Sequence, residues 1–201
     1  MRSTQNYAMN VRFFEGPAGS GKTTRLVEEL AATLNARPLR EHERVLALTK
    51  MHGSRRRMQG RLSELRGLRD RFGCITIDSF AWRILRRWRS LARIRFDEEP
   101  APNDYEGVCR LAGALLADGV VRRWTTSTYP VVLVDEMQDS KDSQLGIVQA
   151  LSESATCLAA ADDYQDLDAS GTNAAVSWAR QYGQVIALTQ NYRTTAAGLL
   201  M

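Results

Sequence analysis

The strongest chemical signal in the sequence is a glycine-rich run that ends in a lysine and a threonine. It reads Gly-Pro-Ala-Gly-Ser-Gly-Lys-Thr, starts at Gly16 and fits the pattern G-x-x-x-x-G-K-[ST]. The glycines let backbone N–H groups turn towards phosphate oxygens, and a helix that starts here adds partial positive charge. We expect Lys22 to reach the β- and γ-phosphates of ATP, and the Thr23 hydroxyl to bind Mg²⁺. The expected nucleotide-binding residues are Gly16, Pro17, Ala18, Gly19, Ser20, Gly21, Lys22, Thr23 and Thr24.

Two carboxylates directly follow a second apolar run, the Val-Val-Leu-Val of residues 131–134. A phosphate loop needs such acids on a neighbouring strand, and the two have separate tasks. Asp135 is expected to hold Mg²⁺, and Glu136 to orient and deprotonate the water that attacks ATP. Alone, this run fits any buried strand that ends at a polar loop. Together with the glycine-rich run it predicts an ATPase site, and a glycine turn that merely caps a helix becomes the weaker interpretation.

Apolar, β-prone runs alternate with longer helical patterns along the chain. Such alternation predicts an α/β fold with a central parallel sheet flanked by helices. We expect strands at residues 11–14, 45–48, 75–77, 131–134, 157–161 and 185–188. We expect helices at residues 23–34, 54–68, 79–91 and 106–117, with an acidic surface linker at residues 96–105. The length fits a single domain that spans residues 1–201.

The acidic motif extends to Asp-Glu-Met-Gln-Asp at residues 135–139, and this form resembles motif II of superfamily 1 helicases of the UvrD/Rep type. Further matches follow in the family's order. Residues 76–81 resemble motif Ib, residues 161–165 motif III and residues 188–194 motif IV. The resemblance implies the N-terminal, RecA-like P-loop NTPase domain of an ATP-dependent DNA helicase. A nucleotide kinase, which also has a phosphate loop, does not account for these additional motifs.

The resemblance also implies roles for three residues near the end of the chain. Gln165 would sense the γ-phosphate, Tyr192 would stack on the adenine, and Arg193 would contact the γ-phosphate from the side opposite the phosphate loop. A cation at that place would stabilise the charge that accumulates during phosphoryl transfer. Taken singly, the three residues also fit a loop amide, a half-buried aromatic and a solvated arginine.

The sequence departs from the family pattern in several places. The chain stops after motif IV, so we expect it to require a second RecA-like domain or a partner subunit for unwinding. The stretch around residues 92–128 is expected to be a short insertion. Asp78 stands where histidine is common in motif Ib, and motif III does not continue into the family's base-stacking residues. A truncated, non-enzymatic module that binds nucleotide or DNA and acts through a partner therefore stays open as an alternative.

Positive charge is concentrated in one part of the chain. The whole protein carries +4, but residues 37–95 hold 17 of its 27 Lys and Arg residues and five acids, a net charge of +12. Such a block favours single-stranded DNA as a partner. Arginines interleave with Trp82 and Trp88, which suits base stacking, although helical spacing equally places both tryptophans in the core. The arginines in question are Arg55, Arg56, Arg57, Arg61, Arg66, Arg69, Arg83, Arg86, Arg87 and Arg89.

Other features of the sequence exclude several classes of protein. No apolar run approaches the roughly 20 residues that a transmembrane helix needs, and the first residues lack the apolar stretch of a signal peptide. We therefore expect a cytoplasmic protein without a membrane partner. The cysteines Cys74, Cys109 and Cys157 are far apart and lack metal-ligand spacing, which predicts reduced, partly buried thiols.

Overall fold

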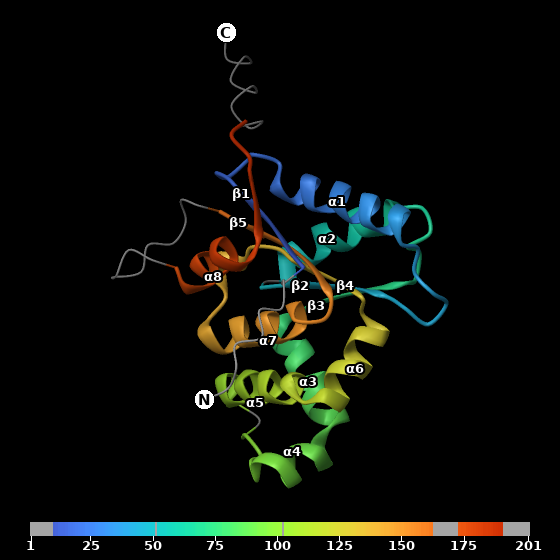
Figure 1. Ribbon diagram of the computed structural model, residues 1–201. Coiled ribbons are helices and arrows are strands. Elements are labelled where there is room, and N and C mark those ends of the chain that lie inside the picture. The colour runs from blue at the N-terminus through green and yellow to red at the C-terminus, as the bar shows by residue number, and fades with distance from the viewer. Residues whose placement is uncertain (1–9, 51, 102, 163–172, 191–201) are drawn as a thin grey trace.

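The described residues form one six-stranded sheet in which all strands run parallel, as the alternating pattern predicted. The computed structural model describes residues 10–50, 52–101, 103–162 and 173–190 (Figure 1). The strand order is β3-β2-β4-β5-β1-β6, and every pairing in it is parallel. The strands are β1 (Val11–Glu15), β2 (Val45–Thr49), β3 (Phe72–Thr76), β4 (Val131–Val134), β5 (Thr156–Ala161) and β6 (Gln184–Ala187).

Helices cover both faces of this sheet (Figure 1). One face is covered by α1 (Lys22–Ala36) and α2 (His52–Glu64). The other face is covered by α3 (Ile77–Arg87), α5 (Tyr105–Ala117), α7 (Asp142–Ser152) and α8 (Ala174–Tyr182). The shorter helices α4 (Arg89–Phe96) and α6 (Gly119–Thr128) join the second layer, and a 3-10 turn, η1 (Met137–Asp139), follows β4. In the described part of the chain, helices long and apolar enough to cross a membrane are absent.

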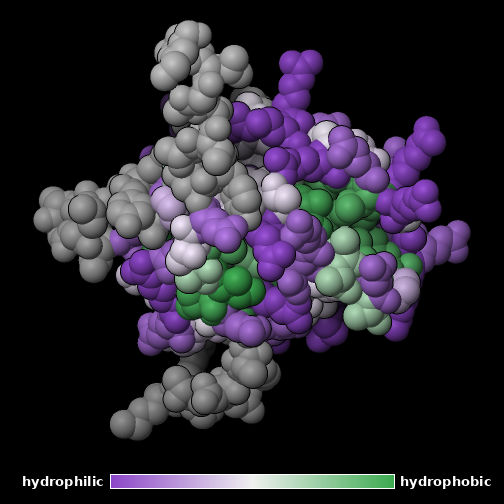
Figure 2. Space-filling model, turned by 90° about the horizontal axis from the view of Figure 1, so that it is seen from above, coloured by the Kyte–Doolittle hydropathy of each residue, from purple (hydrophilic) through white to green (hydrophobic). Residues whose placement is uncertain are grey.

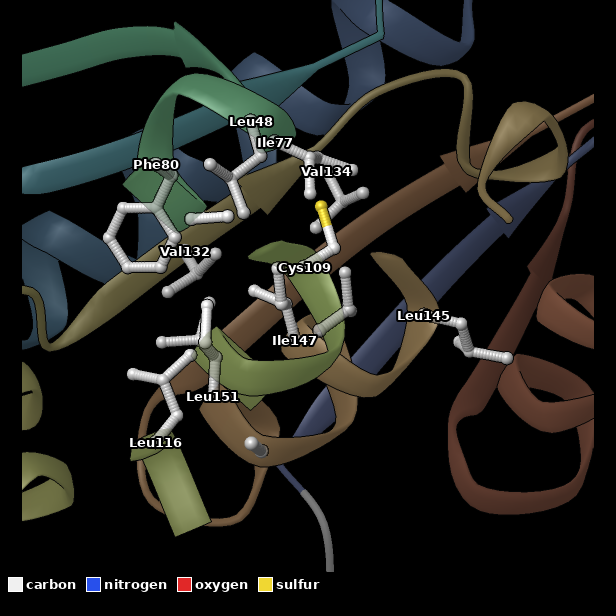
Figure 3. Close-up of a cluster of buried hydrophobic side chains, with 14 of the residues drawn as sticks. Leu48, Ile77, Phe80, Cys109, Leu116, Val132, Val134, Leu145, Ile147 and Leu151 are labelled. Carbon is white, nitrogen blue, oxygen red and sulfur yellow. The ribbon is translucent and has the colours of Figure 1, made fainter. Parts of the chain in front are cut away.

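Side-chain alternation along the strands divides the core into two clusters. Phe13 of β1 packs with the cluster under α3, α5 and α7, whereas Phe14 packs with the cluster under α1 and α2, and both rings are fully buried. Burying a ring of this size stabilises the fold by roughly 1.5–3 kcal/mol. Figure 3 shows the larger cluster, in which Phe80 lies near Val132 and Cys109 near Val134, both on the central strand β4. Burial of both faces explains why β2, β4 and β5 read as continuous apolar runs, whereas the edge strand β6 is largely exposed.

The third strand and the helix after it differ from the prediction. We expected a strand at residues 75–77, but β3 covers Phe72–Thr76 and Ile77 is already the first residue of α3. The cause is a helix cap, because the Thr76 hydroxyl accepts a hydrogen bond from the Ser79 N–H at 3.2 Å. The single helix expected at residues 79–91 is also wrong, since the backbone leaves helical geometry at Trp88 and α4 starts at Arg89.

Residues 92–128 contain the end of α4 together with α5 and α6. Helix α5 packs between α3 and α7, and its Val108, Leu111 and Leu115 are fully buried in the larger core cluster. This stretch is thus part of the main core of the domain. That it is a short insertion relative to the family stays a prediction.

Candidate functional site

The glycine-rich run forms the turn between β1 and α1. Gly19 and Gly21 have φ angles of 86° and 82°, in the left-handed region that side-chain-bearing residues avoid, and Gly21 is the N-cap of α1. A hydrogen bond from the Ser20 N–H to the Pro17 carbonyl, 3.1 Å long, closes the turn. The Ser20 hydroxyl is buried and has no hydrogen-bond partner in the described part of the chain. A buried, unpaired hydroxyl in a loop of this form fits a site that receives phosphate oxygens.

Gly16 is required by close packing, which leads to a first prediction. A Cβ atom on Gly16 would lie 2.4 Å from the Leu188 carbonyl oxygen and 2.8 Å from the Ser20 hydroxyl. We expect Gly16→Ala to push the loop away from the end of β6, to destabilise the protein by about 1–3 kcal/mol and to weaken ATP binding. Denaturant unfolding and nucleotide titration measure the two effects. Gly60→Ala is the control, because nothing lies within 4 Å of a Cβ there, and equal behaviour of the two variants would contradict the prediction.

Lys22 lies buried at the start of α1 and is held over the loop by three oxygen atoms. Its Nζ donates hydrogen bonds to the carbonyl oxygens of Gly16 at 2.7 Å and of Pro17 at 2.9 Å. It also lies 3.5 Å from Oδ2 of Asp162, the residue that follows β5. The ammonium group is therefore fixed at the mouth of the loop, where it can donate to phosphate.

Asp135 and Glu136 follow a strand that does not pair with β1, contrary to the prediction. We expected them on a strand next to β1, but β5 lies between β1 and β4. The carboxylate of Asp135 reaches across β5 to the loop, and Thr23 Oγ1 donates to its Oδ2 at 3.3 Å. The expected meeting of these two side chains is thus present, although the strands that carry them do not pair.

Asp135 is buried close to other negative charge, and this raises the pKa of its carboxyl from 3.8 to about 6. Burial is the largest cause and the Glu136 carboxylate the next, while the Thr23 hydroxyl, the Glu136 N–H and Lys22 act in the opposite direction. Hydroxyl and carboxylate oxygens are the hard ligands that Mg²⁺ prefers, with nucleotide phosphates completing the set. Groups of three or more His, Cys, Asp or Glu side chains that could hold a metal alone are absent from the described ranges.

The raised pKa of Asp135 predicts a pH-dependent stability of the nucleotide-free protein. Below about pH 3.8 the Asp135 carboxyl is protonated in both the folded and the unfolded state, so its ionisation does not change the free energy of unfolding. As the pH rises towards 6, only the unfolded state ionises freely, and the folded state loses about 2–3 kcal/mol of stability. We therefore expect Asp135→Asn to stabilise the metal-free protein by about 1–2 kcal/mol at pH 7, and by less near pH 4.5. Urea unfolding at the two pH values measures this. An equal gain from the exposed Glu64→Gln would contradict the prediction.

Glu136 lies at the turn between β4 and η1, partly exposed to solvent. Its backbone adopts the left-handed conformation, with φ 56° and ψ 48°. The side-chain amide of Gln138 donates a hydrogen bond to Glu136 Oε2 at 2.6 Å. Sequence reasoning did not assign site roles to Gln138 and Asp162, although both stood within the matched motifs.

The remaining predicted nucleotide contacts fall at the margin of the described structure. Gln165, Tyr192 and Arg193 lie outside the described residues, so their assigned roles stay predictions. A cavity of about 590 Å³ opens next to the loop, at the start of α1 and after β6. It is lined by Ser20, Gly21, Thr24, Arg25, Glu28, Ala187, Leu188, Thr189 and Gln190. The described part of the motif IV segment, residues 188–190, therefore lies beside the phosphate loop.

A second cavity, of about 290 Å³, lies beyond the end of β2 and beside the segment that resembles motif Ib. Its lining includes Lys50, Lys141 and Tyr105, and Tyr105 is 60% exposed to solvent. Hydrogen bonds join three of its lining residues: Lys50 donates to Oε1 of Gln144 at 2.9 Å, and the Gln144 amide donates to Asp78 at 2.7 Å. The cavity combines the two lysines with an accessible aromatic ring, and the carboxylates of Asp78 and Glu106 also line it.

The tryptophans of the basic segment belong to the core rather than to an open stacking surface. Trp82 and Trp88 are partly buried and pack against the larger cluster, and Trp88 meets Trp124 edge to face at 6.0 Å. The guanidinium of Arg87 lies 4.3 Å from the centre of the Trp124 ring. The packing thus favours the core alternative for Trp82 and Trp88, while base stacking by these rings stays a prediction.

The arginines of α2 are mostly exposed. Seen from the side on which Figure 1 shows α1 and α2, the surface is largely hydrophilic, with long polar side chains projecting around two smaller hydrophobic areas (Figure 2). Arg56, Arg57 and Arg61 of α2 are exposed, and Arg61 donates to the Thr24 hydroxyl of α1 at 2.6 Å.

The predicted reduced thiols are confirmed, because the three cysteines are free and burial raises the pKa of each, that of Cys157 to about 12.

Two solved structures resemble the chain at low sequence identity. A Pif1 helicase from Candida albicans is 16% identical, with a TM-score of 0.49 over 98% of this chain and 42% of that one. The cytoplasmic domain of the Type VII secretion ATPase EccC from Thermomonospora curvata is 14% identical, with a TM-score of 0.47 over 95% of this chain and 20% of that one. The chain thus spans less than half the length of either protein. No protein of curated function matches the sequence.

A family model gives the decisive comparison. The model described as the UvrD/REP helicase N-terminal domain matches residues 3–104, which is just over half of the 201 residues. The matched range contains the phosphate loop, Lys22 and Thr23 at the start of α1, and the segment that resembles motif Ib. The parallel sheet flanked by helices agrees with this assignment. The chain belongs to the UvrD/REP helicase N-terminal domain family.

Proposed function

We propose that this chain binds Mg·ATP at the phosphate loop and serves as the ATP-hydrolysing motor half of a DNA helicase, which a second RecA-like domain or a partner subunit completes. The observation that carries the proposal is the contact of 3.3 Å between Thr23 Oγ1 and Asp135 Oδ2. It joins the loop to the acidic motif across an intervening strand, directly beside the buried Lys22. This combination serves phosphoryl transfer, in which positioning and charge neutralisation supply most of the catalysis.

Each residue of the site has a defined task in this proposal. Lys22 donates hydrogen bonds to the β- and γ-phosphates, and Thr23 and Asp135 hold Mg²⁺, which neutralises charge on the phosphates. Glu136 accepts a proton from the attacking water. Gln165 and Arg193 would contact the γ-phosphate and Tyr192 the adenine, as the family resemblance implies. The raised pKa of Asp135 supports the metal assignment, because a buried carboxylate without its cation is costly.

We propose that single-stranded DNA contacts the second cavity. Lys50 and Lys141 supply cations for phosphates, and Tyr105 offers a ring on which a base can stack. The exposed arginines of α2 add to the positive charge of the domain, which attracts a nucleic-acid strand. The motor would couple hydrolysis to translocation by closing a cleft between two RecA-like domains, of which this chain supplies one.

This DNA contact gives a third prediction. We expect Tyr105→Ala to weaken binding of an oligothymidylate by about tenfold, because one stacked base contributes about 1–3 kcal/mol. Fluorescence anisotropy at fixed salt measures the affinity. Tyr182→Ala is the matched control, since Tyr182 is similarly exposed but belongs to α8. Unchanged affinity in Tyr105→Ala would show that the strand lies elsewhere.

ATP turnover by this chain, measured with and without single-stranded DNA, tests the proposed function. DNA-stimulated release of phosphate would support a coupled motor site. ATP binding without turnover would support the alternative of a non-enzymatic module that acts through a partner. Phosphate transfer to a small acceptor instead of water would point to a kinase, and the absence of ATP binding would refute the proposal.

A further inference from the structure

A single buried amide joins three parts of the site. Gln138, in the turn η1, is only 1% exposed. Its Nε2 donates to Glu136 Oε2 at 2.6 Å, and its Oε1 accepts from the Asp162 N–H at 2.9 Å. Its backbone carbonyl accepts from the side-chain amide of Asn173, the N-cap of α8, at 2.7 Å. The end of β5, the start of α8 and Glu136 therefore meet at this one residue.

The two side-chain bonds fix the orientation of the amide. A backbone N–H can only donate, so the atom facing Asp162 must be the amide oxygen. An ionised carboxylate can only accept, so the atom facing Glu136 must be the amide nitrogen. A flip of the amide would break both bonds inside a buried site and leave polar groups unpaired, at about 1–3 kcal/mol each. Gln138 consequently holds Glu136 Oε2 at one defined place.

The need for such a tether follows from the backbone of Glu136. Its left-handed conformation costs a side-chain-bearing residue about 1–2 kcal/mol and persists only where its surroundings enforce it. In the described part of the chain, the carboxylate accepts a hydrogen bond from the Gln138 amide and lies close to the negative charge of Asp135. Asp162 contributes twice, because its N–H holds Gln138 and its carboxylate lies 3.5 Å from Lys22 Nζ. The phosphate-binding lysine and Glu136 are thus linked through two residues.

We propose that Gln138 is a positioning residue for ATP hydrolysis: it holds Oε2 of Glu136 so that Oε1 faces the attacking water. The inference rests on the proposed function, in which Glu136 is the general base. Gln138 does not touch the reacting atoms in this scheme. It acts by keeping the base in one orientation, and misplacement of a catalytic group by about 1 Å costs on the order of a hundredfold in rate.

Two variants of matched shape separate positioning from a purely structural role. Gln138→Glu keeps an acceptor for the Asp162 N–H but loses the donor to Glu136. Gln138→Met loses both bonds. Single-turnover hydrolysis, with protein in excess over ATP, gives the rate constant, while nucleotide titration and thermal unfolding give affinity and stability. We expect Gln138→Glu to lower the rate constant by about 30- to 100-fold, with ATP affinity within about twofold. The substitution also lowers the unfolding midpoint, because a buried carboxylate replaces the donor to Glu136, so rates are compared well below that midpoint.

Wild-type rates in Gln138→Glu, with loss of stability confined to Gln138→Met, would overturn the proposal and leave Gln138 as a packing residue. A loss of ATP affinity equal to the loss of rate would overturn it as well, because the amide would then serve binding. The double variant Gln138→Glu/Glu136→Gln adds a second criterion. If Gln138 acts through Glu136, the double variant is no slower than Glu136→Gln alone. If the two residues act independently, the fold-reductions in the rate constant multiply.

Failure of the proposed function looks different in the same measurements. If Glu136→Gln hydrolyses ATP as fast as the wild type, or if the wild type shows no single-turnover hydrolysis, Glu136 is not the base and both proposals fall. If Glu136→Gln is slow and Gln138→Glu is not, only the role of Gln138 is refuted.

Discussion

Replacement of Glu136 by Gln is expected to lower ATP turnover by a factor of about 10²–10⁴ while leaving ATP affinity within about twofold. The amide has the shape of the carboxylate but cannot accept the proton of the attacking water. The loss therefore falls on the chemical step and not on ATP binding. Steady-state phosphate release and equilibrium titration with ATP measure the two quantities on the same protein.

Asp139→Asn is the control for this variant, because it removes a carboxylate from the same turn and Asp139 is exposed. A comparable loss of turnover in both variants would mean that the turn needs negative charge in general. A loss of ATP affinity that matches the loss of turnover in Glu136→Gln would contradict the assignment of a base.

Replacement of Lys22 by Ala is expected to weaken ATP binding by about a hundredfold and to bring turnover close to background. A charge-assisted hydrogen bond is worth about 1.5–3 kcal/mol, and Lys22 is placed to donate to phosphate from a buried position. The variant also removes the partner of the Gly16 and Pro17 carbonyls and of Asp162. We therefore expect a loss of thermal stability in the absence of nucleotide as well.

Lys22→Met separates these effects, since it keeps most of the buried volume and removes only the charge and the donors. The same hundredfold loss of affinity in Lys22→Met, with a smaller loss of stability, would support direct contact with phosphate. ATP affinity that follows stability across both variants would instead show that Lys22 serves the fold of the loop.

Much of the fold could be predicted from local sequence, because the central strands are recognisable as runs of apolar residues. Residues 131–134 were predicted as a strand and form β4, and the predicted starts of β1 and β2 at residues 11 and 45 agree with the structure. Buried parallel strands read as short β-branched runs, and each was bounded by polar residues. The glycine-rich run was also recognisable, because its geometry depends on glycines at fixed spacing.

Three helices were not predicted, for different physical reasons. Helix α6 is rich in threonine, a poor helix former, and is supported by its context: the Asp118 side chain caps it, and Thr125 donates back to the Val121 carbonyl at 2.8 Å. Helix α7 is buried on most of its surface, so its apolar residues do not form a single stripe. Helix α8 is only nine residues long.

The links within the site were beyond local reasoning. Residues 23, 135 and 162 lie far apart in sequence, and the strand order that brings them together leaves no local trace. The pairing of β5 with both β1 and β4 decides which carboxylate faces Lys22. Gln138 was visible as part of a motif, but its role emerged only once the Asp162 N–H was seen beside it.

The position of β5 between β1 and β4 also bears on how the protein folds. The first strand cannot find its neighbour until residues 156–161 are available, some 140 residues later in the chain. Closing such a long loop is slow compared with forming a helix or a hairpin, so we expect the sheet to assemble late. Nucleotide binding would then appear only when the last central strand has joined. During synthesis, we expect ATP binding to appear only after Asp162 has left the ribosome, so ligand affinity would report the joining of β1, β5 and β4.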